Sequence, residues 1–328
     1  MKRNTNDRPG HQRARRTLAS GLFATALLFC GLFLASAAAW AQGDGPRSQL
    51  PMPIGTNVFV PTWLDLNMNS DFSQSILRAD ADVNADILLG VYVRSFAVGD
   101  RYAQVWLVPN WGKLDASVNV AAPGGGTVER SVQQSGFGDP YVAMKIGLVG
   151  APALGLADFM KHKPTFQLYA YAGIYIPVGD YDSGRLLNLG TNRWAWRLGL
   201  PMVFPIGNPQ KQINFEVHPG VTLYGDNSDP AGGAGTVSQD PLYQVEFHLS
   251  RNFSPKWWGS IGGRYRNGGE TSTDGIADDN KQDVLGGELT LGYAFTPHLG
   301  LQATYGQVLT ESDGSQSDMI RLRLNYAY

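Results

Sequence analysis

The chain has 328 residues, a formal net charge of −2 and a single cysteine. Six basic residues and one acidic residue lie in residues 1–41, so the remainder keeps 20 basic and 27 acidic residues, a net charge of −7. An acidic remainder argues against nucleic acid as a partner, because phosphate backbones select basic surfaces. The only cysteine, Cys30, falls in residues 1–41, which excludes disulfides and cysteine metal sites from the rest.

The N-terminus has the three parts of a secretory signal peptide. Basic residues up to Arg16 precede an apolar run from Leu18 to Ala39, and Ala39-Trp40-Ala41 forms a cleavage site. The run is also long enough, at roughly 20 residues, for a permanent membrane anchor, but the cleavage site favours removal. We therefore expect a signal peptide over residues 1–41, a short exposed periplasmic leader over 42–55 and one barrel domain over 56–328.

The rest of the chain predicts an all-β fold, a single antiparallel transmembrane barrel of about 12 strands. Apolar and polar residues alternate between clusters of Gly, Pro, Asn and Asp, and no stretch reaches the roughly 18 apolar residues of a helical span. The candidate strands are mostly longer than the five or six residues usual in a soluble β-sandwich, the alternative fold. In chain order they are residues 56–66, 84–97, 101–111, 138–149, 164–177, 192–205, 211–225, 241–253, 257–267, 283–295, 299–310 and 317–328.

The links between these strands alternate in length. Short links at 98–100, 206–210, 254–256 and 296–298 predict periplasmic turns, and the alternation with long links is typical of outer-membrane barrels. One link, 150–163, is longer than its position requires, and residues 155–162 within it suggest a short helix. The long polar links that predict outer loops are 67–83, 112–137, 178–191, 226–240 and 268–282.

The alternation also assigns the two faces of each strand. Trp194 and Trp196 oppose Arg197, for example, and a basic residue on the lipid face would cost about 2–4 kcal/mol. The apolar set therefore belongs in lipid and the polar set in the lumen. The last strand ends on Tyr328 and should pair back to residues 56–66. This ending resembles the C-terminal signal that the barrel-assembly machinery of Gram-negative bacteria reads, so we expect that machinery, outer-membrane lipid and lipopolysaccharide as partners.

Six segments form a pattern that runs over most of the chain. They are LNLGTNRWAW at 187–196, GFGDP at 136–140, GAPAL at 150–154, PVGDYD at 177–182, QDPLY at 239–243 and TDGIADD at 273–279. Together they resemble the family known as the MetA-pathway of phenol degradation, whose members are thought of as outer-membrane transporters linked to aromatic-compound catabolism. The resemblance implies passive uptake of small organic, including aromatic, compounds. No nucleotide fingerprint is found, and no cofactor is expected.

The lumen face supplies the candidate substrate pathway. Opposed Arg and Glu side chains select solutes by charge, and tyrosines stack on aromatic rings. The alternative is that these groups only fill and cross-link a narrow interior. The candidates are Arg94, Tyr169, Tyr171, Tyr175, Arg193, Arg197, Glu216, His218, Glu246, His248, Arg264, Glu288, Arg321 and Arg323, with Tyr92, Lys145 and Arg266 on the same predicted face.

Two rival functions remain open on the sequence. His248 and Ser250 share a strand face with Glu246, and a base beside a serine is the minimum of a lipid hydrolase. Because that face points into the lumen, away from bilayer lipid, we expect no enzyme. A structural or adhesive barrel acting through its outer loops is the second rival. The loop carboxylates Asp274, Asp278, Asp279 and Asp283 suggest Ca²⁺ binding, but their spacing fits no helix-loop-helix calcium site.

Overall fold

A computed structural model describes residues 43–71, 80–121, 127–185, 187–207, 212–231, 234–310 and 316–328. The predicted signal peptide lies outside these residues. Within the described ranges, no helix combines the length and apolar character that crossing a bilayer would need. The regular structure is almost entirely strand, and the short helix α2 (Leu156–Phe159) falls where the sequence predicts it, between 155 and 162.

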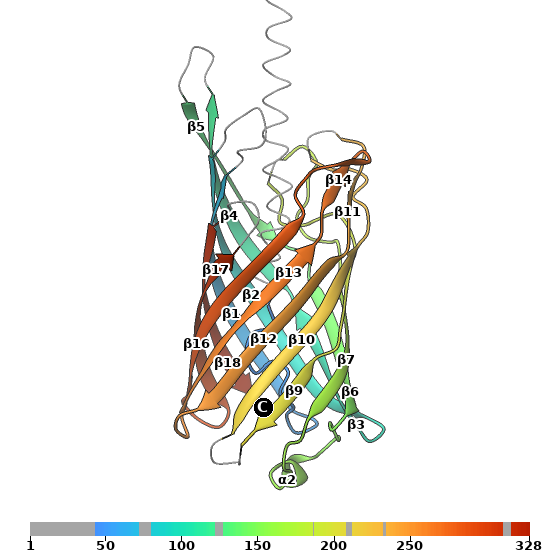
Figure 1. Cartoon of the computed structure of the whole chain (residues 1–328), viewed down its shortest axis with the longest axis vertical. Coiled ribbons are helices and arrows are strands. Elements are labelled where there is room, and N and C mark those ends of the chain that lie inside the picture. Colours follow the sequence, from blue (N-terminus) through green and yellow to red (C-terminus); the bar gives the residue numbers. More distant parts are fainter. Residues whose placement is uncertain are drawn as a thin grey trace, which may run out of the picture.

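The strands close into one twelve-stranded antiparallel barrel (Figure 1). This confirms the predicted fold class. Unbroken strands of the wall are β1 (Asn57–Asp71), β2 (Asp80–Val98), β7 (Gln167–Tyr175), β10 (Ile213–Tyr224), β12 (Leu242–Asn252), β13 (Trp257–Gly268), β16 (Gln282–Ala294), β17 (Leu299–Thr310) and β18 (Gln316–Ala327). The other three are each divided in two: β3 (Arg101–Val108) with β4 (Asn110–Ala121), β5 (Thr127–Phe137) with β6 (Tyr141–Val149), and β8 (Ala195–Gly199) with β9 (Met202–Ile206).

A proline stands at each of these three divisions: Pro109, Pro140 and Pro201. Proline has no N–H to donate, so it interrupts a hydrogen-bonded ladder. The wall still continues across the gap, because the proline carbonyl accepts from the neighbouring strand. Gly90 N donates to Pro109 O at 3.0 Å, and Ile176 N donates to Pro140 O at 3.1 Å.

The barrel closes between its first and last strands. Asn57 and Tyr328 exchange two backbone hydrogen bonds of 2.9 Å, and the register places Trp63 opposite Leu322. The predicted pairing of the C-terminal strand with residues 56–66 is confirmed. At the short-turn end, named for its brief connections, β2 is followed by β3 after two residues, and tight links also follow β12 and β16.

At the opposite end, which we name the outer end, two predicted loops are largely strand. The β1–β2 ladder runs up to the pair Asp71–Asp80, and the β4–β5 ladder runs up to Ala121–Thr127 (Figure 1). The predictions of loops at 67–83 and 112–137 were therefore wrong for the described parts of these segments, whereas 72–79 and 122–126 lie outside the described residues. The described parts keep the period-two alternation of a strand, with polar residues such as Asp82, Lys113 and Gln133 pointing outward, and this polarity led to the loop prediction. The links 226–240 and 268–282 contribute the small sheet of β11 (Val237–Gln239), β14 (Thr271–Thr273) and β15 (Ile276–Ala277).

A row of large outward side chains crosses the first strands of the wall. The register joins Trp63 to Leu88, Leu88 to Trp111 and Trp111 to Phe137, and all four are more than a third exposed. Aromatic girdles of this kind mark the interface between hydrocarbon and water. Two residues nearer the outer end, the outward positions on the same strands are polar: Asp65, Asp86, Lys113 and Ser135.

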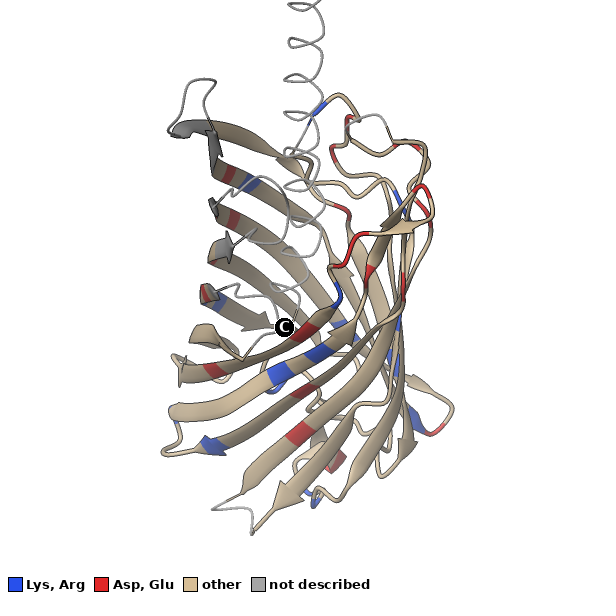
Figure 2. Cartoon of the chain, turned by 45° about the horizontal axis from the view of Figure 1, so that its top comes forward, with Lys and Arg blue, Asp and Glu red and all other residues tan. Residues whose placement is uncertain are grey.

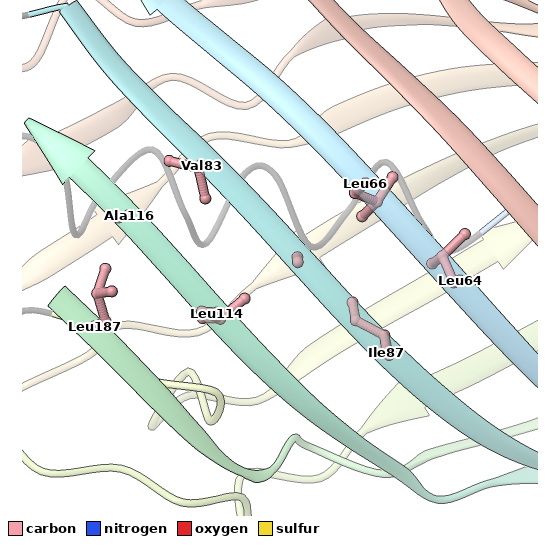
Figure 3. Packing of buried hydrophobic residues seen from close by; sticks show 8 residues of the cluster. Leu64, Leu66, Val83, Ile87, Leu114, Ala116 and Leu187 are labelled. Atoms are coloured by element: carbon pink, nitrogen blue, oxygen red, sulfur yellow. The ribbon is translucent and has the colours of Figure 1, made fainter. Parts of the chain in front are cut away.

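Beyond this row, the inner face of the same strands is apolar. Figure 3 shows Leu64 and Leu66 of β1 beside Ile87 of β2 and Leu114 of β4, with Leu187 contributed by the connection before β8. Leu64 and Leu66 are at most 1% exposed. On this side, the outer part of the lumen is therefore lined with apolar side chains.

Candidate functional site

Charged and polar side chains line the lumen below this apolar wall. Figure 2 shows both signs of charge on neighbouring strands of the barrel. Strand parity and burial place all but one of the predicted pathway residues on the inner side. They are Tyr169, Tyr171, Tyr175, Arg193, Arg197, Glu216, His218, Glu246, His248, Arg264, Glu288, Arg321 and Arg323, together with Lys145 and Arg266.

Arg94 was placed on the wrong face. On either side of Arg94 in β2, Val93 and Ser95 are buried, so Arg94 and Tyr92 point outward. Arg94 is exposed, and its Nη1 donates to Asn57 Oδ1 at 2.9 Å. The prediction assumed that polar residues always face the lumen. Near the short-turn end of β2 the outward positions leave the hydrocarbon, and a polar residue there faces water.

The leader is not exposed as predicted, because residues 43–54 lie inside the lumen. We call them the luminal segment. Gln49 is 3% exposed, and Leu50, Met52 and Ile54 pack against a buried cluster that includes Tyr102. The strand periodicity gave no sign of this, because the segment has none. The only available signal was a short polar run, Asp44 to Gln49, between the cleavage site and the first strand.

Glu246 of β12 joins the luminal segment to the barrel. Its carboxylate accepts the backbone N–H of Gly45 at 2.7 Å and that of Asp44 at 3.2 Å. The same carboxylate pairs with Arg264 at 3.0 Å and with His248 at 2.8 Å. A single buried carboxylate thus holds two backbone amides and two side chains.

A second carboxylate, Glu216 of β10, holds the next part of the segment. It accepts the backbone N–H groups of Arg47 at 2.8 Å and Gln49 at 3.0 Å. Two cations bind the segment's carbonyls: Lys145 Nζ donates to Gln49 O at 2.8 Å, and Arg323 Nη1 donates to Asp44 O at 2.8 Å. The barrel therefore recognises the segment mainly through its main chain.

Asp44 binds the barrel wall through its side chain as well as its main chain. Its Oδ1 lies 2.9 Å from Arg197 Nη1, and its Oδ2 lies 2.9 Å from His218 Nδ1. Burial by itself would raise the pKa of Asp44, but the Arg197 charge and the His218 hydrogen bond outweigh it and hold that pKa well below its ordinary value. Asp44 is therefore a carboxylate anion seated on a cationic site of the wall.

Tyrosines surround this cationic site. The Tyr171 ring meets the His218 ring edge-on at 4.8 Å between centroids, and the Arg197 guanidinium lies 5.3 Å from the Tyr171 centroid. Tyr141, which the sequence analysis missed, shares a 2.6 Å hydroxyl contact with Tyr171 and stacks on Tyr175 at 4.3 Å. Two of the predicted inward tyrosines thus belong to one aromatic group beside Arg197.

The remaining candidates are dispersed. Arg193 lies nearer the outer end, where its guanidinium bonds Gln239 and lies 4.9 Å from the Tyr224 ring. Arg321 pairs with Glu288 at 3.3 Å. Tyr169 donates to Gln167 at 2.9 Å.

The proposed hydrolase pair does not have the geometry of an activated serine. His248 Nε2 is bonded to Glu246, and its Nδ1 lies 3.4 Å from Glu288. Ser250 Oγ instead accepts from Arg47 Nε at 3.4 Å and is fully buried in the lumen. Neither group reaches bilayer lipid.

The acidic outer loop does not gather its carboxylates. Asp274 accepts the Thr236 N–H at 2.8 Å, and Asp278 accepts the Thr271 hydroxyl at 2.5 Å. Asp283 belongs to β16 and accepts from Tyr265. Over the ranges that the structure describes, no three His, Cys, Asp or Glu side chains are grouped so as to hold a metal ion.

A cavity of about 50 Å³ lies beside the luminal segment, between the apolar wall and the charged residues. Leu66 and Met319 form its apolar side, and Glu246, Arg264 and Arg321 are among its charged lining. Two glycines at inward positions leave room against the wall here, Gly286 on β16 and Gly306 on β17.

Solved structures of the same fold are outer-membrane barrels. The COG4313 outer membrane channel from Pseudomonas putida F1 is 21% identical, with a TM-score of 0.61, over 87% of this chain and 99% of that one. The transport unit of the autotransporter AIDA-I from Escherichia coli is 9% identical, with a TM-score of 0.52, over 94% of this chain and 98% of that one. No curated protein matches the chain.

The architecture and the outward apolar band are those of a barrel in the outer membrane of a Gram-negative cell. A family model matches residues 65–324, which is nearly all of the predicted barrel domain. The resemblance noted from the six sequence segments is thereby confirmed: the chain belongs to the family described as "Putative MetA-pathway of phenol degradation".

Proposed function

We propose that this protein is an outer-membrane channel for passive uptake of small organic molecules, aromatic compounds among them. The observation that carries this proposal is the composition of the lumen, where an apolar wall, a tyrosine group and a charged region follow one another inside a closed barrel. An apolar solute with a polar substituent finds a matching surface for each part. The family description and the channel of the same fold from Pseudomonas putida support the same function.

The luminal segment sets a condition on uptake. It lies in the lumen and is bonded to Glu216, Glu246 and Arg323 of the wall. We infer that passage of an aromatic solute requires part of that segment to move. No nucleotide site is suggested by the sequence, and transport is therefore downhill.

We infer that the chain is not an enzyme. The one sequence feature that favoured catalysis, His248 with Ser250, is engaged in separate contacts inside the lumen. The similar solved structures are named as a channel and a transport unit. We also propose that the C-terminal strand is read by the barrel-assembly machinery and that lipopolysaccharide covers the outer girdle.

Flux into liposomes tests the channel. Purified protein in liposomes should admit benzoate faster than protein-free liposomes do. Arg197→Ala should lower this flux, because it removes a buried cation from the lumen. Arg94→Ala is the matched control, since its side chain lies outside the barrel. Benzoate entry no faster than in protein-free liposomes would refute the proposed function.

A further inference from the structure

We propose that Arg197 and His218 form a carboxylate-binding site for aromatic acids, and that Asp44 of the luminal segment occupies this site until a solute exchanges with it. This inference rests on the proposed function and names its substrate class. The site would take a small aromatic ring that bears one carboxylate. Uptake would then proceed by replacement of one carboxylate by another.

The site already holds a carboxylate in a well-formed geometry. Both oxygens of Asp44 are bound, one by Arg197 and the other by His218, each at 2.9 Å. Arg197 and His218 are each 2% exposed, so the site is shielded from bulk water. Charge-assisted hydrogen bonds are roughly twice as strong as neutral ones, which makes the arrangement selective for an anion.

The surroundings fit an aromatic ring attached to that carboxylate. Tyr171 contacts both His218 and Arg197, and Tyr141 and Tyr175 extend the aromatic surface away from the charged pair. Aromatic rings pair favourably at centroid separations of about 4.5–7 Å, in stacked or edge-on arrangements. Asp44 itself carries only a methylene group behind its carboxylate, so it has no ring to pair with these tyrosines.

Charge balance favours exchange over simple displacement. Among the strand residues of the inner wall, Lys145, Arg197, Arg264, Arg266, Arg321 and Arg323 face only three carboxylates, Glu216, Glu246 and Glu288. Loss of Asp44 without replacement would leave a buried cation short of a counter-charge, which is costly. An arriving carboxylate restores the balance, whereas a neutral solute does not.

The segment can release Asp44 without leaving the barrel. Residues 47–54 have their own contacts with Glu216, Lys145 and the cluster around Tyr102. Residues 43–45 are held by Arg197, His218, Glu246 and Arg323, and Gln49 Nε2 also donates to Asp44 Oδ2 at 2.9 Å. Glu246 also lines the cavity, so the carboxylate site and the cavity adjoin. A solute in the cavity is therefore next to the site that it must enter.

Binding of benzoate to the purified full-length mature protein tests this inference. Titration calorimetry should give an affinity for benzoate about tenfold tighter in Asp44→Asn than in the unchanged protein, because the tethered competitor has lost its charge. Benzamide, which has the same shape without the charge, should bind weakly and equally to both. Arg197→Gln should abolish benzoate binding, and Arg94→Gln should leave it unchanged.

Folding of each variant is checked by the heat-dependent mobility of the barrel on gels. If Asp44→Asn does not fold, Asp44→Ser carries the same expectation. Equal affinity for benzoate with and without Asp44 would overturn the inference, as would benzamide binding as tightly as benzoate.

The two proposals can fail separately. Benzoate flux into liposomes with no gain in affinity in Asp44→Asn would keep the channel and reject the exchange site. A gain in affinity without any flux would keep the site and reject the channel.

Discussion

Two parts of the barrel wall use the same alternation with opposite polarity. On β10 and β12 the inward residues include Glu216 and Glu246, and the outward residues include Leu249, which is 42% exposed. On the outer parts of β1 and β2 the inward residue Leu64 is fully buried, while Asp86 faces outward. The first part has a charged lumen and an apolar exterior, and the second has the reverse.

The difference shows that height in the membrane, and not strand periodicity, decides which set faces outward. In the charged part the exterior is hydrocarbon, so outward residues must be apolar. Beyond the row of Trp63 and Trp111 the exterior is water, and polar residues are tolerated there. The apolar set can then turn inward and line the lumen.

The largest effect should follow removal of Glu246. Glu246→Ala leaves Arg264, His248 and two backbone amides of the luminal segment without their acceptor. We expect the free energy of unfolding to fall by about 3–5 kcal/mol, measured by urea unfolding in lipid vesicles. Asp86→Ala, an outward carboxylate of the other part, should change it by less than about 0.5 kcal/mol. Similar losses from both would mean that the two parts do not differ.

The second-largest effect should come from an arginine introduced on the outer surface of the barrel, and its cost should differ between the two parts of the wall. Leu289 is outward near the middle of β16 and is 60% exposed, whereas Asn84 is outward on the outer part of β2. Leu289→Arg should lower the free energy of unfolding by about 2–4 kcal/mol, because it places a cation in hydrocarbon. Asn84→Arg should cost under about 1 kcal/mol in the same urea experiment. An equal loss of free energy of unfolding in both variants would mean that Asn84 faces lipid, and the row of Trp63 and Trp111 would then not mark the edge of the hydrocarbon.

The contact of Asp44 should have a characteristic pH dependence. Asp44→Asn should cost about 1.5–3 kcal/mol at neutral pH, the usual range for hydrogen bonds to a charged group. The folded pKa of Asp44 lies below its ordinary value of 3.8, so the difference from the unchanged protein should stay constant from pH 8 to 5. It should shrink only as the pH falls below about 3.8. A difference already lost between pH 7 and 5 would argue against the Arg197 pairing.

The smallest effect is expected at Arg94. Because its side chain is exposed outside the barrel and bonds only Asn57 among the contacts described, Arg94→Ala should alter the free energy of unfolding by no more than about 0.5 kcal/mol. Benzoate flux should be unchanged. A clear loss of flux would indicate that Arg94 faces the lumen, which would contradict the burial of Val93 and Ser95.

The strand pattern predicted most of the wall and misread two kinds of position. Clean alternation identified the inward faces of β8, β10, β12 and β18 correctly, because lipid on the far side leaves one arrangement possible. It failed at 67–83 and 112–137, where water on the far side removes that constraint. It also failed at Arg94, where the membrane ends before the strand does.

The sequence analysis predicted the residues of the barrel wall that form the candidate site. It did not predict that the luminal segment binds them. Arg197, His218 and Glu246 follow from strand parity, but nothing local connects them to Asp44 and Gly45. The contacts between the luminal segment and the wall join residues that are far apart in the sequence; Arg323 and Asp44, for example, are 279 positions apart. The leader has no periodicity, so its burial could not be inferred from its own residues.

Alternation along the chain was enough to predict a closed barrel of about twelve strands, a C-terminal strand that pairs with the first, and a charged inner face. Period-two alternation against lipid is a local property, and each strand carries it independently. The position of the luminal segment in this interior, with Asp44 bound to Arg197 and His218, is visible only in the folded barrel. Those contacts form because buried cations and carboxylates need partners, and which partners they find depends on the closure of the barrel around them.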